Sequence, residues 1–197
     1  MQFKLFGCKI HISFLFVAVL ALFSILDTSM VVILGVSAAL IHELTHITAL
    51  VIIGKYPDSI SFQPFGIKMK ICKLKTSFSY SKEVFVLLSG CMMNLLIFAV
   101  IYNIKGELTL VSAVHLVTGV FNLLPIGILD GGRFTFLTLQ QFCSIRTAYI
   151  ISEVISYVII APIFMVGIFL FWRSYYNFTL LLTSIYLLSA LIIKQRS

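Results

Sequence analysis

Long apolar stretches separated by short polar segments dominate the pattern along the chain. Six of them are long enough to cross a bilayer, since a spanning helix needs about 20 mostly apolar residues. They fall at residues 10–26, 29–54, 84–103, 108–125, 147–172 and 176–193. The segments left between them are too short for a second domain. The pattern therefore predicts an all-α integral membrane protein, with residues 1–197 forming a single polytopic domain of about six transmembrane helices.

One segment between the second and third spans has a different period. In residues 65–73, apolar and polar or small residues alternate, which is typical of a β-strand. We therefore expect a small β-hairpin or sheet between helices 2 and 3. The sequence leaves two roles open for it: its edge adds an extended substrate segment by β-augmentation, or its lysines anchor it to lipid.

The stretch "NLLPIGILDGGR" at residues 122–133 also departs from the helical pattern. Pro125 must end the fourth helix, and the glycines that follow allow tight turns. Irregular backbone at membrane depth is tolerated only where protein or a water-filled cavity surrounds it. We therefore expect a broken, re-entrant segment after helix 4, facing the interior of the bundle.

Composition and charge agree with a membrane protein and exclude a soluble globular domain. Hydrophobic residues make up 60% of the 197 positions, charged residues 11%, and the mean hydropathy is +1.11. The net charge is +7, but twelve of the fourteen Lys and Arg fall on one side of the six predicted spans, leaving Lys105 and Arg173 on the other. The positive-inside rule then places both termini in the cytosol of a multi-pass cell-membrane protein. The basic excess thus indicates contact with anionic lipid and no nucleic-acid partner.

Two features of the chain's start and its cysteines have simple interpretations. The first apolar stretch also has the form of a signal peptide, but no small-residue cleavage site follows it, so we treat it as a span. The cysteines stand apart without a C-x-x-C pair and predict no disulfide framework; they are Cys8, Cys72, Cys91 and Cys143.

Ionisable residues within the second span are the strongest functional signal. His42, Glu43 and His46 form the pattern H-E-x-x-H. Residues four apart share one face of a helix, so both imidazoles can reach one metal ion, and Glu43 can reach a water beside it. Each ionisable side chain near the bilayer centre costs about 2.5–3.5 kcal/mol. A metal site explains three of them in five residues better than polar contacts between helices do.

A catalytic zinc site usually takes a third protein ligand. Asp130 should lie toward the same cytosolic leaflet as His46, and it is the favoured candidate because the backbone broken by proline and glycine gives it a reason to be there. Glu153, early in the fifth span, is the rival. We expect His115 to make a hydrogen bond between helices, and His11 to lie at the membrane interface.

Three motifs together resemble the site-2 protease family of intramembrane zinc metalloproteases. They are "HELTH" at 42–46, "SGCMMN" at 89–94 and "NLLPIGILDGG" at 122–132, in the order found in that family. The order of the spans is most similar to the sporulation (SpoIVFB-type) branch, whose members release a mother-cell sigma factor from its pro-sequence. Two departures are a Gly90-Cys91 pair where the family usually has Gly-Pro, and the CBS domain of that branch, which we expect to be missing here.

The resemblance implies an intramembrane zinc endopeptidase with one Zn²⁺ per chain, bound by His42, His46 and Asp130. Glu43 would be the general base and Asn122 would engage the substrate backbone. Asn94 has two interpretations, as a packing residue or as a residue of the active site. The implied partners are a membrane-tethered protein substrate, possible membrane-bound inhibitory or regulatory proteins and, for the sporulation branch, a pro-sigma factor. The alternative from another class is a metal transporter, which internal repeats would favour; we find none.

Overall fold

A computed structural model of the chain describes residues 2–5, 8–12, 29–55, 59–63, 66–70, 79–173 and 179–195. The chain divides into two compact units, residues 1–121 and 122–197, which are described in turn. The single polytopic domain expected from the sequence stays a prediction.

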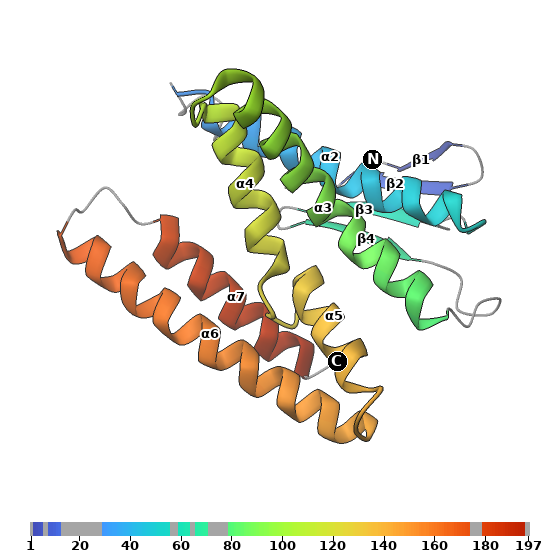
Figure 1. The fold of residues 1–197 in the computed structure, drawn as a ribbon. Coiled ribbons are helices and arrows are strands. Elements are labelled where there is room, and N and C mark those ends of the chain that lie inside the picture. The colour runs from blue at the N-terminus through green and yellow to red at the C-terminus, as the bar shows by residue number, and fades with distance from the viewer. Residues whose placement is uncertain are drawn as a thin grey trace. The chain divides into compact units, whose positions relative to one another are not determined.

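The first unit contains a four-stranded sheet in the order β1-β2-β3-β4 (Figure 1). Its strands are β1 (Gln2–Leu5), β2 (Cys8–Ile12), β3 (Ser59–Gln63) and β4 (Gly66–Lys70). β3 and β4 pair antiparallel between the second and third predicted spans, where the alternating pattern predicts a hairpin. In the described part of the sheet, β4 is an edge strand.

The N-terminal strands correct the expected start of the first span. Residues 10–12 belong to β2, which pairs antiparallel with β1 and parallel with β3. A span cannot therefore begin at residue 10. The cause is visible in the sequence, because Cys8, Ile10 and Ile12 alternate with Lys9 and His11 immediately before the apolar run. The rest of that predicted span, residues 13–26, lies outside the described residues.

The described residues of the first unit also form the helices α2 (Val31–Ile52), α3 (Tyr80–Lys105) and most of α4 (Leu110–Leu123). α2 and α3 pack side by side. α3 ends at Gly106, whose φ of +71° is the left-handed conformation that favours glycine at a helix C-terminus. α4 begins after Thr109, whose side-chain oxygen accepts a hydrogen bond from the Ser112 N–H at 3.2 Å, as an N-cap does.

The second unit contains α5 (Asp130–Leu139), α6 (Ile145–Arg173) and α7 (Thr179–Gln195). α6 and α7 lie side by side as a helical hairpin (Figure 1). They approach closely at Gly167, where an added Cβ would lie 3.0 Å from the Cα of Leu181. Residues 124–129 are not helical, so the predicted break after the fourth span is confirmed. A new helix, α5, begins at Asp130, where the sequence predicts only a broken segment.

Three of the described helices, α2, α3 and α6, are long and apolar enough to cross a membrane. The helix in the fourth predicted span is shorter than expected, and the sixth predicted span is described from residue 179 onward. α4 has 14 residues and α7 has 17, which at 1.5 Å per residue is about 21 and 25 Å against a hydrocarbon core of about 30 Å. α4 stops at Leu123 because Pro125 lies two residues further on.

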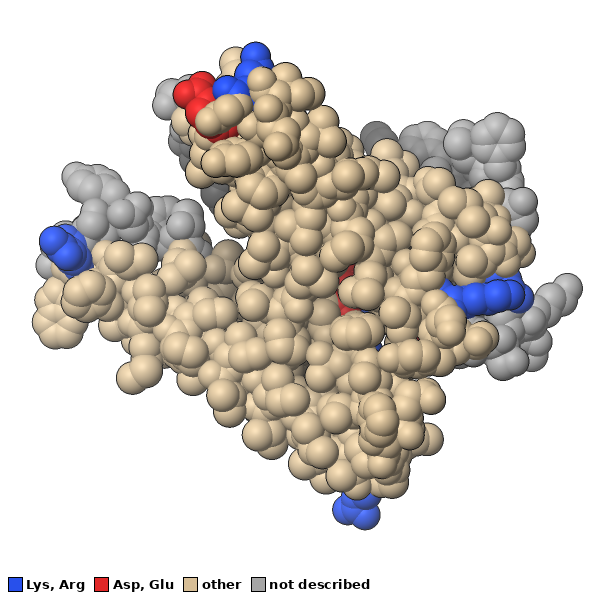
Figure 2. All heavy atoms as spheres, in the orientation of Figure 1, with Lys and Arg blue, Asp and Glu red and all other residues tan. Residues whose placement is uncertain are grey.

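Apolar side chains cover much of the surface of each helix, as expected where lipid is the solvent. Ile104 on α3 is 75% exposed and Trp172 on α6 is 79% exposed. The face drawn in Figure 2 carries few charged side chains. Several charges mark helix termini, including Lys105 at the end of α3 and Arg173 at the end of α6. An exposed apolar surface of this extent is unusual for a soluble protein.

Candidate metal centre

Two buried histidines on one face of α2 form the core of the candidate site. His42 and His46 are only 4% and 5% exposed. Their Nε2 atoms lie 3.0 Å apart, and the two rings are nearly perpendicular, at 88°. Two nitrogens that share a tetrahedral zinc at 2.0–2.1 Å lie about 3.3 Å apart. The α2 helix therefore presents the pair at nearly the spacing that a common metal ion requires.

A backbone carbonyl of α3 determines the tautomer of His46. Its Nδ1 lies 2.7 Å from the oxygen of Val86. A carbonyl oxygen can only accept, so Nδ1 carries the hydrogen and Nε2 keeps its lone pair for a metal. The Ser89 hydroxyl donates to the same carbonyl at 2.7 Å. Metal-binding histidines characteristically donate their second N–H in this way, which orients the ring.

Gly90 lets the backbone of α3 approach both imidazoles. A Cβ added there would lie 2.6 Å from His46 Nε2 and 2.8 Å from Nδ1 and Cε1 of His42. Any larger residue would therefore press on the ring atoms of both histidines. The surfaces that face α3 at Gly90 are therefore the two imidazoles.

Asp130 is the first residue of α5 in the second unit. Its carboxylate thus lies at a helix N-terminus, where the helix dipole favours a negative charge. The two glycines that follow are both buried. A Cβ at Gly131 would overlap the Leu123 carbonyl, and one at Gly132 would overlap the Ile126 carbonyl. Glycine at both positions allows α5 to pack directly on the turn that precedes it.

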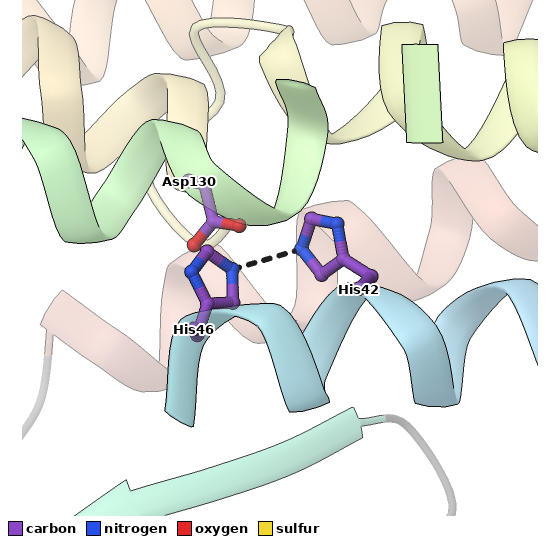
Figure 3. Close-up of side chains that lie close together, drawn as sticks. All are labelled: His42, His46 and Asp130. Atoms are coloured by element: carbon purple, nitrogen blue, oxygen red, sulfur yellow. Dashed lines mark hydrogen bonds between the residues drawn. The ribbon is translucent and has the colours of Figure 1, made fainter. Parts of the chain in front are cut away.

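The three predicted ligands lie together in the structure. The ligand atoms of His42, His46 and Asp130 all lie within 4.8 Å of one another, with the carboxylate facing the two rings (Figure 3). Two imidazole nitrogens and one carboxylate oxygen form a donor set that suits zinc and leaves a fourth position open. The residues present therefore fit a zinc ion. The rival ligand Glu153 is not in this group; it interacts with Tyr149, one turn earlier on α6.

The other candidate residues have different surroundings. Glu43 is half-buried beside His42, and Asn122 is half-buried on the last turn of α4; the roles of both stay predictions. Asn94 on α3 is fully buried, and its Oδ1 accepts a hydrogen bond from Nδ1 of His115 on α4 at 2.9 Å. This confirms the hydrogen bond between helices expected for His115; both interpretations of Asn94 stay predictions.

No sequence pattern predicts the groups that orient the ligands. The carbonyl of Val86 is a backbone atom, so no residue type could indicate it. Ser156 on α6 accepts a hydrogen bond from the N–H of Gly127, in the turn before Asp130. A serine in an apolar helix is too common to indicate such a contact. The only sequence signal is that it follows Ser152 by one helical turn.

Comparison with known proteins identifies the fold. No family model and no curated protein matches the chain. Among solved structures, it is similar to a site-2 protease from Methanocaldococcus jannaschii, with a TM-score of 0.66 and 22% sequence identity. The similarity covers 95% of this chain and 91% of that one. The chain therefore has a fold similar to that of a site-2 protease.

Proposed function

We propose that the protein is an intramembrane zinc-dependent endopeptidase that cleaves a membrane-associated protein. The observation that carries the proposal is the grouping of His42, His46 and Asp130, with ligand atoms within 4.8 Å of one another, in a chain of this fold. Glu43 follows His42 directly in the H-E-x-x-H pattern, where such a metal centre requires its general base. We assign one Zn²⁺ to each chain, with these three residues as its protein ligands.

When bound, zinc supplies Lewis-acid activation of water and of the scissile carbonyl. In our proposal the Glu43 carboxylate accepts a proton from the attacking water while the water oxygen bonds to the carbonyl carbon of the peptide. Glu43 then returns that proton to the leaving nitrogen as the C–N bond breaks, giving a carboxylic acid and an amine. Asn122 would hold the substrate backbone through its amide. The Val86 carbonyl would keep the His46 ring in place throughout.

The substrate must present an extended peptide, since a helix hides its peptide bonds. β4 is an edge strand of the described sheet, and such an edge can pair with a substrate segment. We propose that both termini and this sheet lie on the cytosolic side, because the Lys and Arg residues are concentrated there. The active site would then lie toward the cytosolic leaflet. A membrane-tethered pro-protein is the proposed substrate class. A sporulation pro-sigma factor is the specific candidate, and membrane-bound inhibitors are proposed regulatory partners.

The test is co-expression of the chain with tagged candidate pro-proteins in membranes. Cleavage should occur with the wild type and disappear with Glu43→Gln, while the purified variant still binds zinc. The matched control is Glu107→Gln, the same chemical change at an exposed glutamate between α3 and α4. Cleavage that persists in Glu43→Gln would remove Glu43 from the mechanism. Loss of cleavage in both variants would show that the effect is not specific to the site.

A further inference from the structure

The turn that leads into α5 is held by a side chain from α6. Ser156 is fully buried. Its Oγ accepts a hydrogen bond from the N–H of Gly127 at 2.9 Å and donates to the carbonyl of Ser152 at 2.7 Å. The carbonyl of Pro125 lies 3.4 Å from the same oxygen. One hydroxyl group therefore links α6 to the backbone of the turn three residues before Asp130.

The rest of the turn has little freedom to adjust. The N–H of Ile126 donates to the carbonyl of Leu124 at 2.7 Å, and the N–H of Leu129 donates to the carbonyl of Ile126 at 2.8 Å. The Ile126 side chain is fully buried. Because Gly131 and Gly132 pack directly on the carbonyls of Leu123 and Ile126, the start of α5 follows the turn closely. A shift at Gly127 would therefore move the first residue of α5, which is Asp130.

We propose that Ser156 is a positioning residue for the Asp130 carboxylate and thereby sets the affinity of the metal centre. The inference rests on the proposed zinc site. Metal–ligand distances vary by only about 0.2 Å between good sites, so a small displacement of α5 is enough to weaken the bond. Removal of the hydroxyl takes away the oxygen that accepts the hydrogen bond from the Gly127 N–H. Because a buried N–H without an acceptor is costly, the turn would shift toward another acceptor.

The matched control is Ser184 on α7. It is also fully buried, and its hydroxyl donates to the carbonyl of Leu181 at 2.8 Å. Ser156→Ala and Ser184→Ala thus both remove a buried hydroxyl from an apolar helix. Of the two, Ser156 is the one whose hydroxyl contacts the turn before Asp130 in the described residues.

The experiment measures Zn²⁺ affinity by chelator competition on purified full-length protein, together with the absorption spectrum of the Co²⁺-substituted protein and the melting temperature. We expect Ser156→Ala to lower zinc affinity roughly tenfold or more and to change the Co²⁺ spectrum, whereas Ser184→Ala retains both wild-type values. If Ser156→Ala fails to fold, Ser156→Cys, which keeps a weak acceptor, should show an intermediate loss. Wild-type affinity and spectrum in the folded Ser156 variant would overturn the proposal.

Failure of the underlying zinc site gives a different result. In that case the wild type itself would not bind zinc stoichiometrically, or Asp130→Ala would bind it as tightly as the wild type does. If the wild type and Asp130→Ala behave as expected and only Ser156→Ala is silent, the zinc site stands and the positioning role of Ser156 is refuted.

Discussion

A single methyl group at Gly90 tests how closely α3 approaches the two histidines. In Gly90→Ala the new Cβ would lie 2.6 Å from His46 Nε2. To reach even the 3.0 Å that real Cβ contacts respect, the imidazole must retreat by about 0.4 Å, and for ordinary contact at 3.4 Å by about 0.8 Å. Both values exceed the roughly 0.2 Å tolerance of a metal–ligand bond. His42 is displaced at the same time, since two of its ring atoms lie 2.8 Å from the new carbon.

We therefore expect Gly90→Ala to lower zinc affinity roughly 10- to 100-fold, which is about 1.4–2.8 kcal/mol. Overall stability should change less, because alanine is favoured over glycine within a helix by about 1 kcal/mol. Chelator competition on detergent-purified protein measures the affinity, and thermal melting of the metal-free protein measures stability.

The control is Gly35→Ala in α2, the same substitution at a helical position where an added Cβ has no neighbour within 4 Å. It should leave zinc affinity unchanged. If Gly90→Ala binds zinc as tightly as Gly35→Ala does, the two imidazoles have room to move, and the close approach of α3 to the ligands is refuted.

Three further predictions concern the core, the turn and the topology. His115→Ala should lower the free energy of unfolding by about 1–3 kcal/mol, since it removes the hydrogen-bond partner of the buried Asn94 amide. The control Asn103→Ala, at an exposed amide, should lower it much less in the same denaturation assay. Equal losses in the two variants would contradict this. Gly132→Ala should abolish tight zinc binding, because its Cβ overlaps the Ile126 carbonyl and α5 cannot pack on the turn; chelator competition measures this, and wild-type affinity would refute it. Lys68→Cys on β4, in a cysteine-free background, should react with an impermeant maleimide only from the cytosolic side, and labelling of intact cells from outside would reverse the topology.

The sequence predicted the site better than it predicted the lengths of the helices. His42 and His46 could be assigned because their spacing matches the helical repeat, and Asp130 because Pro125 and the glycines give an apolar run an irregular backbone. Both signals come from residues that are close in sequence, so they do not depend on which distant segments come into contact. The three motifs also occur in the order found in the site-2 protease family, and this order led to the predicted fold class.

The remaining features depend on contacts between distant segments. Pairing of β2 with β3 joins residues about 50 positions apart, and the short alternation at residues 8–12 adjoins an apolar run that suggested a helix. α5 was missed because the glycines that allow the turn also lower helix propensity. The Val86 carbonyl accepts a hydrogen bond from His46, and the Ser156 hydroxyl accepts one from the Gly127 N–H. Each bond has a backbone atom at one end, and backbone atoms carry no sequence signal.

The most direct test of the central claim is the zinc content and affinity of three purified proteins: wild type, Asp130→Ala and Glu153→Ala. We predict one tightly bound zinc per chain in the wild type, a large loss of affinity in Asp130→Ala and wild-type binding in Glu153→Ala. Full, tight zinc occupancy in Asp130→Ala, with loss in Glu153→Ala, would show that a different carboxylate completes the site and would contradict the account.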